Sequence, residues 1–241
     1  MADLSIIQDT SSIAAIDCDY EARRSERDRL GLSEIGDPCA RVLWYKHNKY
    51  QKKEIKGRVL RLFQLGNLIE EQMSTDLKSA GFLIHSQQRR VVFTQGELEL
   101  NGSIDGIIER LLESNQPHLW ECKSMASKGF AKLKTHGYEA YDQKYKAQIH
   151  VYAMGLKLKR IFVTVYNKDT SELYQERIHT NKAFATEMLQ RAFDVVGSKT
   201  PPPKINERAE FYTCSWCDFK EYCHYGKPGP VVAPGKGVGK W

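Results

Sequence analysis

The apolar residues of this chain alternate between the repeat of a helix and the repeat of a strand, which restricts its fold more than any other feature. Residues 57–81 carry apolar side chains three and four positions apart, which is typical of an amphipathic helix ending at Gly81. Residues 89–93, 98–111 and 118–123 are β-rich runs separated by turn-forming residues. We expect these runs to form three consecutive strands of a meander.

The alternation continues to the C-terminal third of the chain. An earlier helix is expected from Asp37-Pro38 onward, because proline favours the first turn of a helix. The later elements are a helix, two strands and a helix, at residues 137–158, 160–167, 173–178 and 181–197. This order predicts an α/β fold in which a central mixed sheet is flanked by helices on both sides.

Length and composition favour one substantial domain. The chain has 241 residues, of which 41% are hydrophobic. We expect an N-terminal lead-in over residues 1–35, the domain over 36–225, and a flexible tail rich in Gly, Pro and Lys over 226–241. No apolar run has the length of a membrane span and no signal peptide is evident, so we expect a cytoplasmic protein without membrane contact. The net charge of +6 permits a polyanionic partner.

The stretch HLWECKS, residues 118–124, carries an acid, a thiol and a lysine in succession. On a strand, Glu121 and Lys123 share one face while Cys122 faces the other way, into the core. A salt bridge at the end of a strand is the simpler alternative.

Two further acids stand among apolar residues. Glu70 falls in the middle of the apolar face of the helix at 57–81, unless its side chain extends to the rim of that face. Asp105 lies between isoleucines, and the neighbouring Gly102 and Gly106 would let another group approach the backbone. A bulge or turn capped by Asp105 is the structural alternative.

Taken together, these side chains form a set with a recognisable chemistry. The carboxylates of Glu70, Asp105 and Glu121 are hard oxygen ligands of the kind that Mg²⁺ and Mn²⁺ prefer. Such an ion can polarise a phosphoryl oxygen and generate a hydroxide nucleophile, and Lys123 can orient the water or stabilise charge on the phosphate.

In this order and spacing the motifs resemble the PD-(D/E)xK nuclease superfamily, and in particular its RecB-like branch. Asp105 and Glu121-Cys122-Lys123 carry the superfamily pattern. Gln148-x-x-x-Tyr152 resembles the glutamine-tyrosine motif of the branch, and Gly66-x-x-x-Glu70 resembles the motif on its first core helix. The resemblance covers residues 36–225 and implies a restriction-endonuclease-like core.

Two positions depart from the family pattern. RecB-like families often have histidine where this chain has Glu70, which is nearer to phage exonucleases of the lambda type. The residue before Asp105 is Ile104, where the superfamily pattern has proline.

The resemblance implies a role for each matching residue. Glu70, Asp105, Glu121 and the backbone carbonyl of Cys122 would bind Mg²⁺ or Mn²⁺, and Lys123 would stabilise the attacking hydroxide or the transition state. Gln148 would position DNA or water, with Tyr152 supporting it.

The implied activity is a metal-dependent DNA exonuclease that acts on linear DNA with ends. We expect it in phage or mobile-element recombination or repair, where a recombination protein is a candidate partner. No oligomeric state follows from the sequence. The alternatives are a structure-specific endonuclease on the same fold and a non-catalytic module that binds DNA ends.

The cysteines form a second candidate site near the C-terminus. The pattern Cys214-x2-Cys217-x5-Cys223 supplies three thiolates, which suit either Zn²⁺ or an iron–sulfur cluster. The candidates for the fourth ligand are Cys39, Cys18 and His224. Resemblance to AddB-type and CRISPR-associated RecB-like nucleases implies a [4Fe-4S] cluster with Cys39 as the fourth ligand, which would staple the ends of the domain together.

Basic residues around the motifs are candidates for contacts with a phosphate backbone. They are Arg89, Arg90, Lys128, Lys132, Lys134, Lys144 and Lys146. Lys128, Lys132 and Lys134, between the third strand and the next helix, are the best placed.

Overall fold

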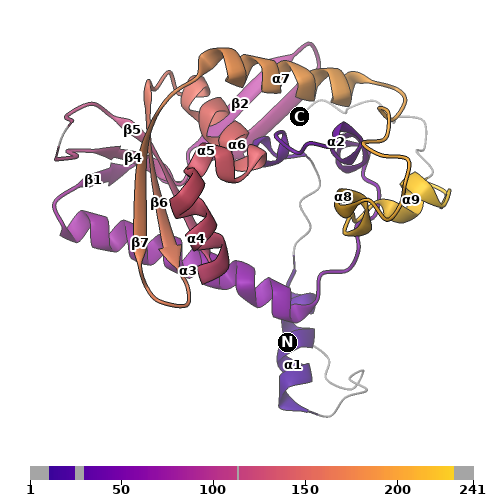
Figure 1. Cartoon of the computed structure of the whole chain (residues 1–241), viewed down its shortest axis with the longest axis horizontal. Helices are drawn as coiled ribbons and strands as arrows, with labels where there is room; N and C mark the ends of the chain where they lie inside the picture. Colours follow the sequence, from indigo (N-terminus) through magenta and orange to yellow (C-terminus); the bar gives the residue numbers. More distant parts are fainter. Residues whose placement is uncertain (1–10, 25–29, 113, 231–241) are drawn as a thin grey trace, which may run out of the picture.

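A five-stranded mixed sheet lies at the centre of the structure, a computed structural model that describes residues 11–24, 30–112 and 114–230 (Figure 1). Its strand order is β1-β4-β5-β6-β7, and β2 and β3 form a separate two-stranded sheet. The strands are β1 (Leu83–His85), β2 (Arg90–Gln95), β3 (Leu98–Ser103), β4 (Gly106–Glu109), β5 (His118–Met125), β6 (Arg160–Asn167) and β7 (Leu173–His179). β5 and β6 are parallel, and the other neighbouring pairs are antiparallel.

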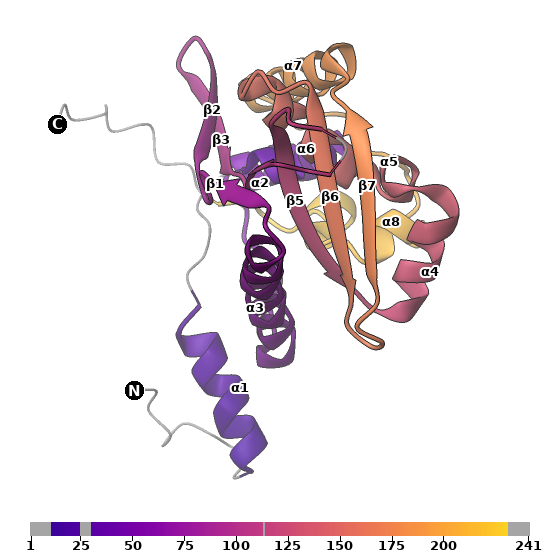
Figure 2. The ribbon, with the colours of Figure 1, turned by 90° about the vertical axis from the view of Figure 1, so that its left-hand side faces the viewer.

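Helices cover both faces of the sheet, which confirms the predicted α/β fold class. The helices of the described residues are α1 (Ser12–Ala22), η2 (Leu32–Glu34), α2 (Ala40–His47), α3 (Gly57–Ser79), α4 (Ser127–His136), α5 (Tyr138–Tyr141), α6 (Gln143–Gly155), α7 (Lys182–Gly197), α8 (Tyr212–Ser215) and α9 (Lys220–His224). Figure 2 shows α3 on one side of the sheet and α4 on the opposite side.

Each face of β5 belongs to a different part of the core, as its alternating side chains require. Leu119 joins the larger cluster, which contains residues of α4, α6 and α7. Trp120 and Cys122 join a smaller cluster that includes Met73 of α3 and Phe162 of β6. The prediction that Cys122 fills the core is therefore confirmed, and Glu121 falls on the face toward α6.

The prediction of a three-stranded meander is wrong. The run 98–111 divides into β3 and β4, which belong to different sheets. Between them, the amide of Ile104 donates to the carbonyl of Arg89 and the carbonyl of Ile104 accepts from Gln88. The chain therefore changes sheets at Asp105. β4 pairs with β1 on one side and with β5 on the other. β1 was not predicted, because its three residues are too few to show a hydrophobic period.

The helix predicted over 137–158 is interrupted. Asp142 adopts an extended backbone, and its carboxylate accepts the amide of Lys144 at 2.7 Å, so Asp142 caps α6 and separates it from α5. α6 ends at Gly155. α4 was not predicted, although its buried Phe130 and Leu133 stand three positions apart.

The lead-in contributes one described helix and part of the loop that enters the domain. In α1, Glu21 accepts the amide of Gly57 at 2.7 Å and Asp17 pairs with Arg61 of α3. Residues 1–10 and 25–29, and residues 231–241 of the predicted tail, lie outside the described residues. Within the described part of the chain, no helix combines the length and apolarity needed to cross a membrane.

Candidate functional site

A cleft of about 1020 Å³ opens between α3, the C-terminal half of β5 and α6. Its lining contains most of the residues predicted for the metal site, together with Leu62 and Phe63 from the first half of α3. The predicted residues that line it are Glu70, Asp105, Cys122, Lys123, Gln148 and Tyr152. Glu121 is fully buried beneath the cleft.

Glu121 is the most constrained side chain of this cleft. Its Oε1 accepts a hydrogen bond from Gln148 Nε2 at 2.7 Å and pairs with the ammonium of Lys123. Its Oε2 is buried and has no hydrogen-bonding partner among the described residues. Burial raises the pKa of the carboxyl, against the attraction of Lys123, and the nearby charge of Asp105 raises it further.

Asp105 occupies the point where the chain passes from β3 to β4. Its Oδ2 accepts the backbone amide of Cys122 at 2.8 Å, so this carboxylate lies beside the strand that carries Glu121 and Lys123. Burial raises its pKa, while Lys123 and the hydrogen bond from Cys122 oppose that shift. The change of sheet is what brings Asp105 to the cleft.

Glu70 reaches the same cleft from α3 and accepts a hydrogen bond from Gln88 Nε2 at 3.1 Å. Burial and the charge of Asp105 raise its pKa to about 7, although Lys123 and Gln88 act in the opposite direction. Other elements do not cover the apolar face of α3 around Glu70, since Leu62 and Phe63 are 42% and 54% exposed. Glu70 is half-buried at the cleft wall.

Lys123 lies among these acids. Burial alone would lower its pKa, but the charges around it, Glu121 first, raise the pKa well above its usual value, so the side chain stays protonated. Its Nζ also lies 5.4 Å from the centre of the Tyr145 ring. Lys123 thus carries a fixed positive charge at the wall of the cleft.

Gln148 and Tyr152 both come from α6, one turn apart. Gln148 is held by its bond to Glu121. Tyr152 is 2% exposed, and its hydroxyl lies so close to Gly102 that a Cβ at this position would overlap it. The close approach that Gly102 was expected to allow is therefore made by the Tyr152 ring, which packs α6 against β3.

The donor chemistry of the cleft fits a hard divalent cation. A buried oxygen of Glu121 has no partner among the described residues, and the charge of Asp105 raises the pKa values of both Glu70 and Glu121. The carboxylates are not yet gathered as in a metal centre. Across the described residues, no group of three or more His, Cys, Asp or Glu side chains lies close enough together to hold an ion. In this arrangement Lys123 and Gln148 hold the inner carboxylate.

Two basic residues of the cleft were missed by the sequence analysis. Lys52 and Lys168 line it, and neither stands in a recognisable motif. The lysines that were preferred, Lys128, Lys132 and Lys134, are exposed on α4 and do not line the cleft. Lys132 lies over the ring of Tyr141, while Lys134 lies near Glu172.

Three of the remaining candidate basic residues also have local partners. Arg90 pairs with Glu99 at 2.6 Å, Lys144 lies 3.9 Å from Asp37, and Lys146 lies 3.5 Å from Glu139. Arg89 is exposed.

The predicted cysteine ligands line a second cavity, at the other end of the molecule from β1. Cys39 lies directly before α2, and the others belong to the segment of α8 and α9. Figure 1 shows α2, α8 and α9 at the end of the molecule opposite β1. The described lining includes Cys39, Cys214, Cys217, Cys223 and His224, but not Cys18 of α1. All six cysteines are free thiols in the structure.

These thiols influence one another. Burial raises the pKa of Cys217 to about 11, and the neighbouring Cys39 and Cys223 add to the shift. Arg41 donates from Nη1 to Cys223 Sγ at 3.5 Å and from Nε to the carbonyl of Pro202 at 2.6 Å. A bound metal cation would lower the pKa of these thiols again, because metal ions bind the deprotonated thiolate.

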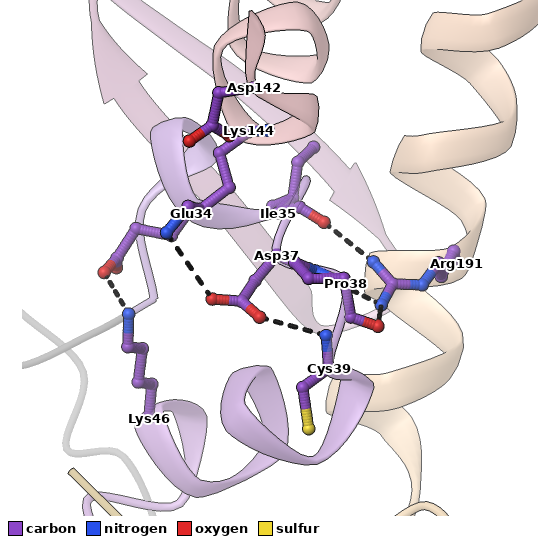
Figure 3. Close-up of polar contacts among 9 residues, drawn as sticks. All are labelled: Glu34, Ile35, Asp37, Pro38, Cys39, Lys46, Asp142, Lys144 and Arg191. Carbon is purple, nitrogen blue, oxygen red and sulfur yellow. Dashed lines mark hydrogen bonds and ion pairs between the residues drawn. The ribbon is translucent and has the colours of Figure 1, made fainter. Parts of the chain in front are cut away.

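The segment that carries Cys39 also contributes to the cleft, because Glu34 lines it. Figure 3 shows the polar contacts of this segment. Arg191 of α7 donates to the carbonyls of Ile35 and Asp37 at 3.0 and 2.8 Å. Glu34, which lines the cleft, pairs with Lys46 of α2 at 2.5 Å. Residues 34–39 thus connect the cleft wall to the cysteine cavity.

Comparisons with known proteins show likeness at the level of the fold. No family model matches the chain, and no curated protein matches it. The crystal structure of SSO0001 is similar with a TM-score of 0.52 and 16% identity, covering 85% of this chain and 90% of that one.

Two structures of the alkaline exonuclease LHK-Exo from Laribacter hongkongensis are also similar, with lower TM-scores. One has a TM-score of 0.47 and 14% identity, covering 74% of this chain and 90% of that one. The other, a complex with dAMP, has a TM-score of 0.45 and 13% identity, covering 74% of this chain and 89% of that one.

Proposed function

We propose that this protein is a Mg²⁺- or Mn²⁺-dependent DNA exonuclease whose catalytic domain spans residues 36–225. One observation carries the proposal: Glu70, Asp105 and Lys123, which come from different elements, line one cleft, and Glu121 is buried directly beneath it in a pair with Lys123. The buried Oε2 of Glu121 has no partner among the described residues, an arrangement that a packed core would not favour and that a cation would relieve.

When bound, the metal would supply Lewis-acid polarisation of the phosphodiester and a water activated for attack. Glu70, Asp105, Glu121 and the carbonyl of Cys122 would hold it. The chain's own contribution is positional and electrostatic. Lys123, kept protonated by the surrounding acids, would stabilise negative charge on the phosphate.

Gln148 and Tyr152 would act from α6. Gln148 is oriented by Glu121 and would present its amide to a phosphate or a water. Tyr152 would fix the position of α6, since its ring is packed against Gly102. Lys52 and Lys168 would add positive charge along the path of the DNA backbone.

For the cysteine cavity we propose a [4Fe-4S] cluster held by Cys39, Cys214, Cys217 and Cys223, with Zn²⁺ as the alternative. The convergence of these thiols from distant parts of the chain supports a bound metal. The cluster would be structural, since phosphodiester hydrolysis requires no redox step. Visible absorption, which an iron–sulfur cluster has and Zn²⁺ lacks, together with metal analysis of anaerobically purified protein, would distinguish the two.

The decisive experiment uses end-labelled linear DNA beside covalently closed circular DNA, each with Mg²⁺, Mn²⁺ or EDTA. We expect metal-dependent loss of the linear DNA only. Glu121→Gln and Lys123→Met should each lower the rate by about 10³-fold or more. Glu71→Gln is the matched control, because Glu71 is the exposed neighbour of Glu70 on α3 and does not line the cleft.

Other results would select the alternatives. Cutting of the circular DNA would identify a structure-specific endonuclease. Binding of DNA ends without any cleavage by a folded, metal-loaded protein would identify a binding module and contradict the proposed catalysis.

A further inference from the structure

Beneath the cleft, Tyr138 carries a buried hydroxyl that packing alone does not account for. The side chain is fully buried, and its hydroxyl has no hydrogen-bonding partner among the described residues. Such a hydroxyl lowers stability, because it has lost its hydrogen bonds to water and gained none in the protein. Phenylalanine would fill the same space without that cost, so the hydroxyl requires a further explanation.

Tyr138 is held in place at the start of α5. Its backbone amide donates to Glu176 Oε2 at 2.8 Å, and the Tyr174 hydroxyl donates to the same oxygen at 2.5 Å. Its ring stacks on the ring of Tyr145, with the centroids 5.6 Å apart and the planes inclined by 19°. Because both the main chain and the ring are fixed, the fold determines where the Tyr138 hydroxyl lies.

This hydroxyl lies beside the pair of Glu121 and Lys123. The ring of Tyr145 that stacks on Tyr138 also has its centroid 5.4 Å from Lys123 Nζ. Burial raises the pKa of Tyr138 well above its usual value, the charge of Glu121 adds to that shift, and Lys123 opposes it. Burial lowers the pKa of Lys123, but Glu121 and then Tyr138 raise it. The three side chains therefore form one buried group.

A cation at Glu121 would leave Lys123 without its present partner. In the structure the ammonium of Lys123 pairs with Glu121 Oε1. A cation bound to this carboxylate would neutralise it and repel the ammonium, which would then need another acceptor. Only 22% of the Lys123 side chain is exposed, so water would replace the lost partner incompletely. A tyrosine hydroxyl can accept a hydrogen bond from an ammonium.

We propose that the Tyr138 hydroxyl accepts a hydrogen bond from Lys123 when a divalent cation binds Glu121. Tyr138 would then be a positioning residue, because it would hold the ammonium at the cleft wall, where the proposed reaction develops negative charge. The described lining of the cleft does not include Tyr138, so its effect would pass through Lys123. This inference rests on the proposed function, since it requires that the cleft binds Mg²⁺ or Mn²⁺.

Tyr138→Phe removes only the hydroxyl, and we expect it to have opposite effects on the protein with and without metal. Without metal, the loss of an unpaired buried hydroxyl should raise the Tm by about 2 to 4 °C, as measured by differential scanning calorimetry in EDTA. With metal, the loss of the acceptor should weaken Mn²⁺ binding about tenfold, as measured by isothermal titration calorimetry. A tyrosine that only packs α5 would show neither effect.

Two comparisons test whether Tyr138 acts through Lys123. In the Lys123→Met background, Tyr138→Phe should leave the Mn²⁺ affinity unchanged, because the ammonium is absent. Tyr141→Phe is the matched control, because it removes a hydroxyl from a half-buried position of the same helix outside the cleft lining. It should neither raise the Tm nor weaken Mn²⁺ binding. The relevant binding is the part that Glu121→Gln abolishes.

The possible results separate this inference from the proposed function. A Tm of Tyr138→Phe in EDTA no higher than that of the wild type would show that the hydroxyl already has a partner, such as a bound water, and would overturn the inference. Equal Mn²⁺ affinity of these two proteins, or the same tenfold loss in the Lys123→Met background, would overturn it and leave the proposed function intact. If the wild-type protein bound no Mn²⁺, the proposed function and the inference would fail together.

Discussion

At the scale of single residues, the pair of Glu121 and Lys123 determines the character of the cleft. A fully buried carboxylate is costly unless it is paired, and here one oxygen is paired while the other has no partner within the described part of the chain. Side chains placed for stability alone do not usually leave such an atom unsatisfied. The pair is therefore better explained by a function that uses the second oxygen.

This pairing leads to a prediction about stability without metal. Lys123→Met should lower the free energy of unfolding by roughly 3 kcal/mol, because it leaves Glu121 buried without its counter-ion. Glu121→Gln should cost less, because Lys123 keeps 22% of its side chain exposed and can be solvated. Urea denaturation in EDTA measures both changes.

The double variant tests whether the two side chains interact. Glu121→Gln with Lys123→Met should cost less than the sum of the single changes, since the double variant, unlike the single ones, leaves no charged side chain without its partner. Strictly additive costs would show that the pair contributes no coupling energy.

At the scale of elements, α6 is packed against the hairpin of β2 and β3 through a close approach that requires glycine. Gly102→Ala should destabilise the protein by about 2 kcal/mol, because the new Cβ overlaps the Tyr152 hydroxyl. Tyr152→Phe removes that hydroxyl, so it should recover part of the loss when combined with Gly102→Ala.

Gly66→Ala is the control for this pair. Gly66 lies within α3, where an added Cβ has only Ser124 Oγ nearby, at 3.9 Å. This change should stabilise the protein by about 0.5 to 1 kcal/mol, because alanine favours a helix. Equal costs for the two glycine substitutions in urea denaturation would contradict the close approach.

The contact of α7 with the segment before α2 gives another prediction. Arg191→Met should lower the free energy of unfolding by roughly 2 kcal/mol, because Ile35 and Asp37 lose their charged donor. Arg191→Lys should recover only part of the lost free energy of unfolding, since an ammonium does not reproduce the forked donor geometry of a guanidinium. Arg58→Met, at an exposed position of α3, should change stability by less than about 0.5 kcal/mol.

At the scale of the whole molecule, the cysteine cavity joins the two ends of the domain. Cys39 precedes the sheet in sequence, while the other three thiols follow it. A metal bound by all four would close a very long loop and so restrict the unfolded chain.

Removal of that metal should therefore affect the entire domain. We expect Cys39→Ser to lower the Tm by roughly 10 °C, given about 4 kcal/mol for closing a long loop. Cys18→Ser is the control, because Cys18 does not line the cavity. Differential scanning calorimetry under anaerobic conditions makes the comparison, and equal Tm values for the two variants would show that Cys39 binds no structural metal.

Several of the helices and strands followed from the sequence alone because hydrophobic period is a local property. The long helix was predicted at 57–81 and occupies Gly57–Ser79, and strands were predicted at 160–167 and 173–178 and occupy Arg160–Asn167 and Leu173–His179. The residue types of the candidate site were likewise evident, since acids among apolar residues stand out in any sequence.

Only the tertiary structure decided where these residues lie. The division of 98–111 between two sheets depends on backbone bonds from Ile104 to distant residues, which no local pattern records. Lys52 and Lys168 reach the cleft through strand pairing and packing between separated segments. The sequence thus determined the elements and their chemistry, whereas long-range pairing determined which side chains share a site.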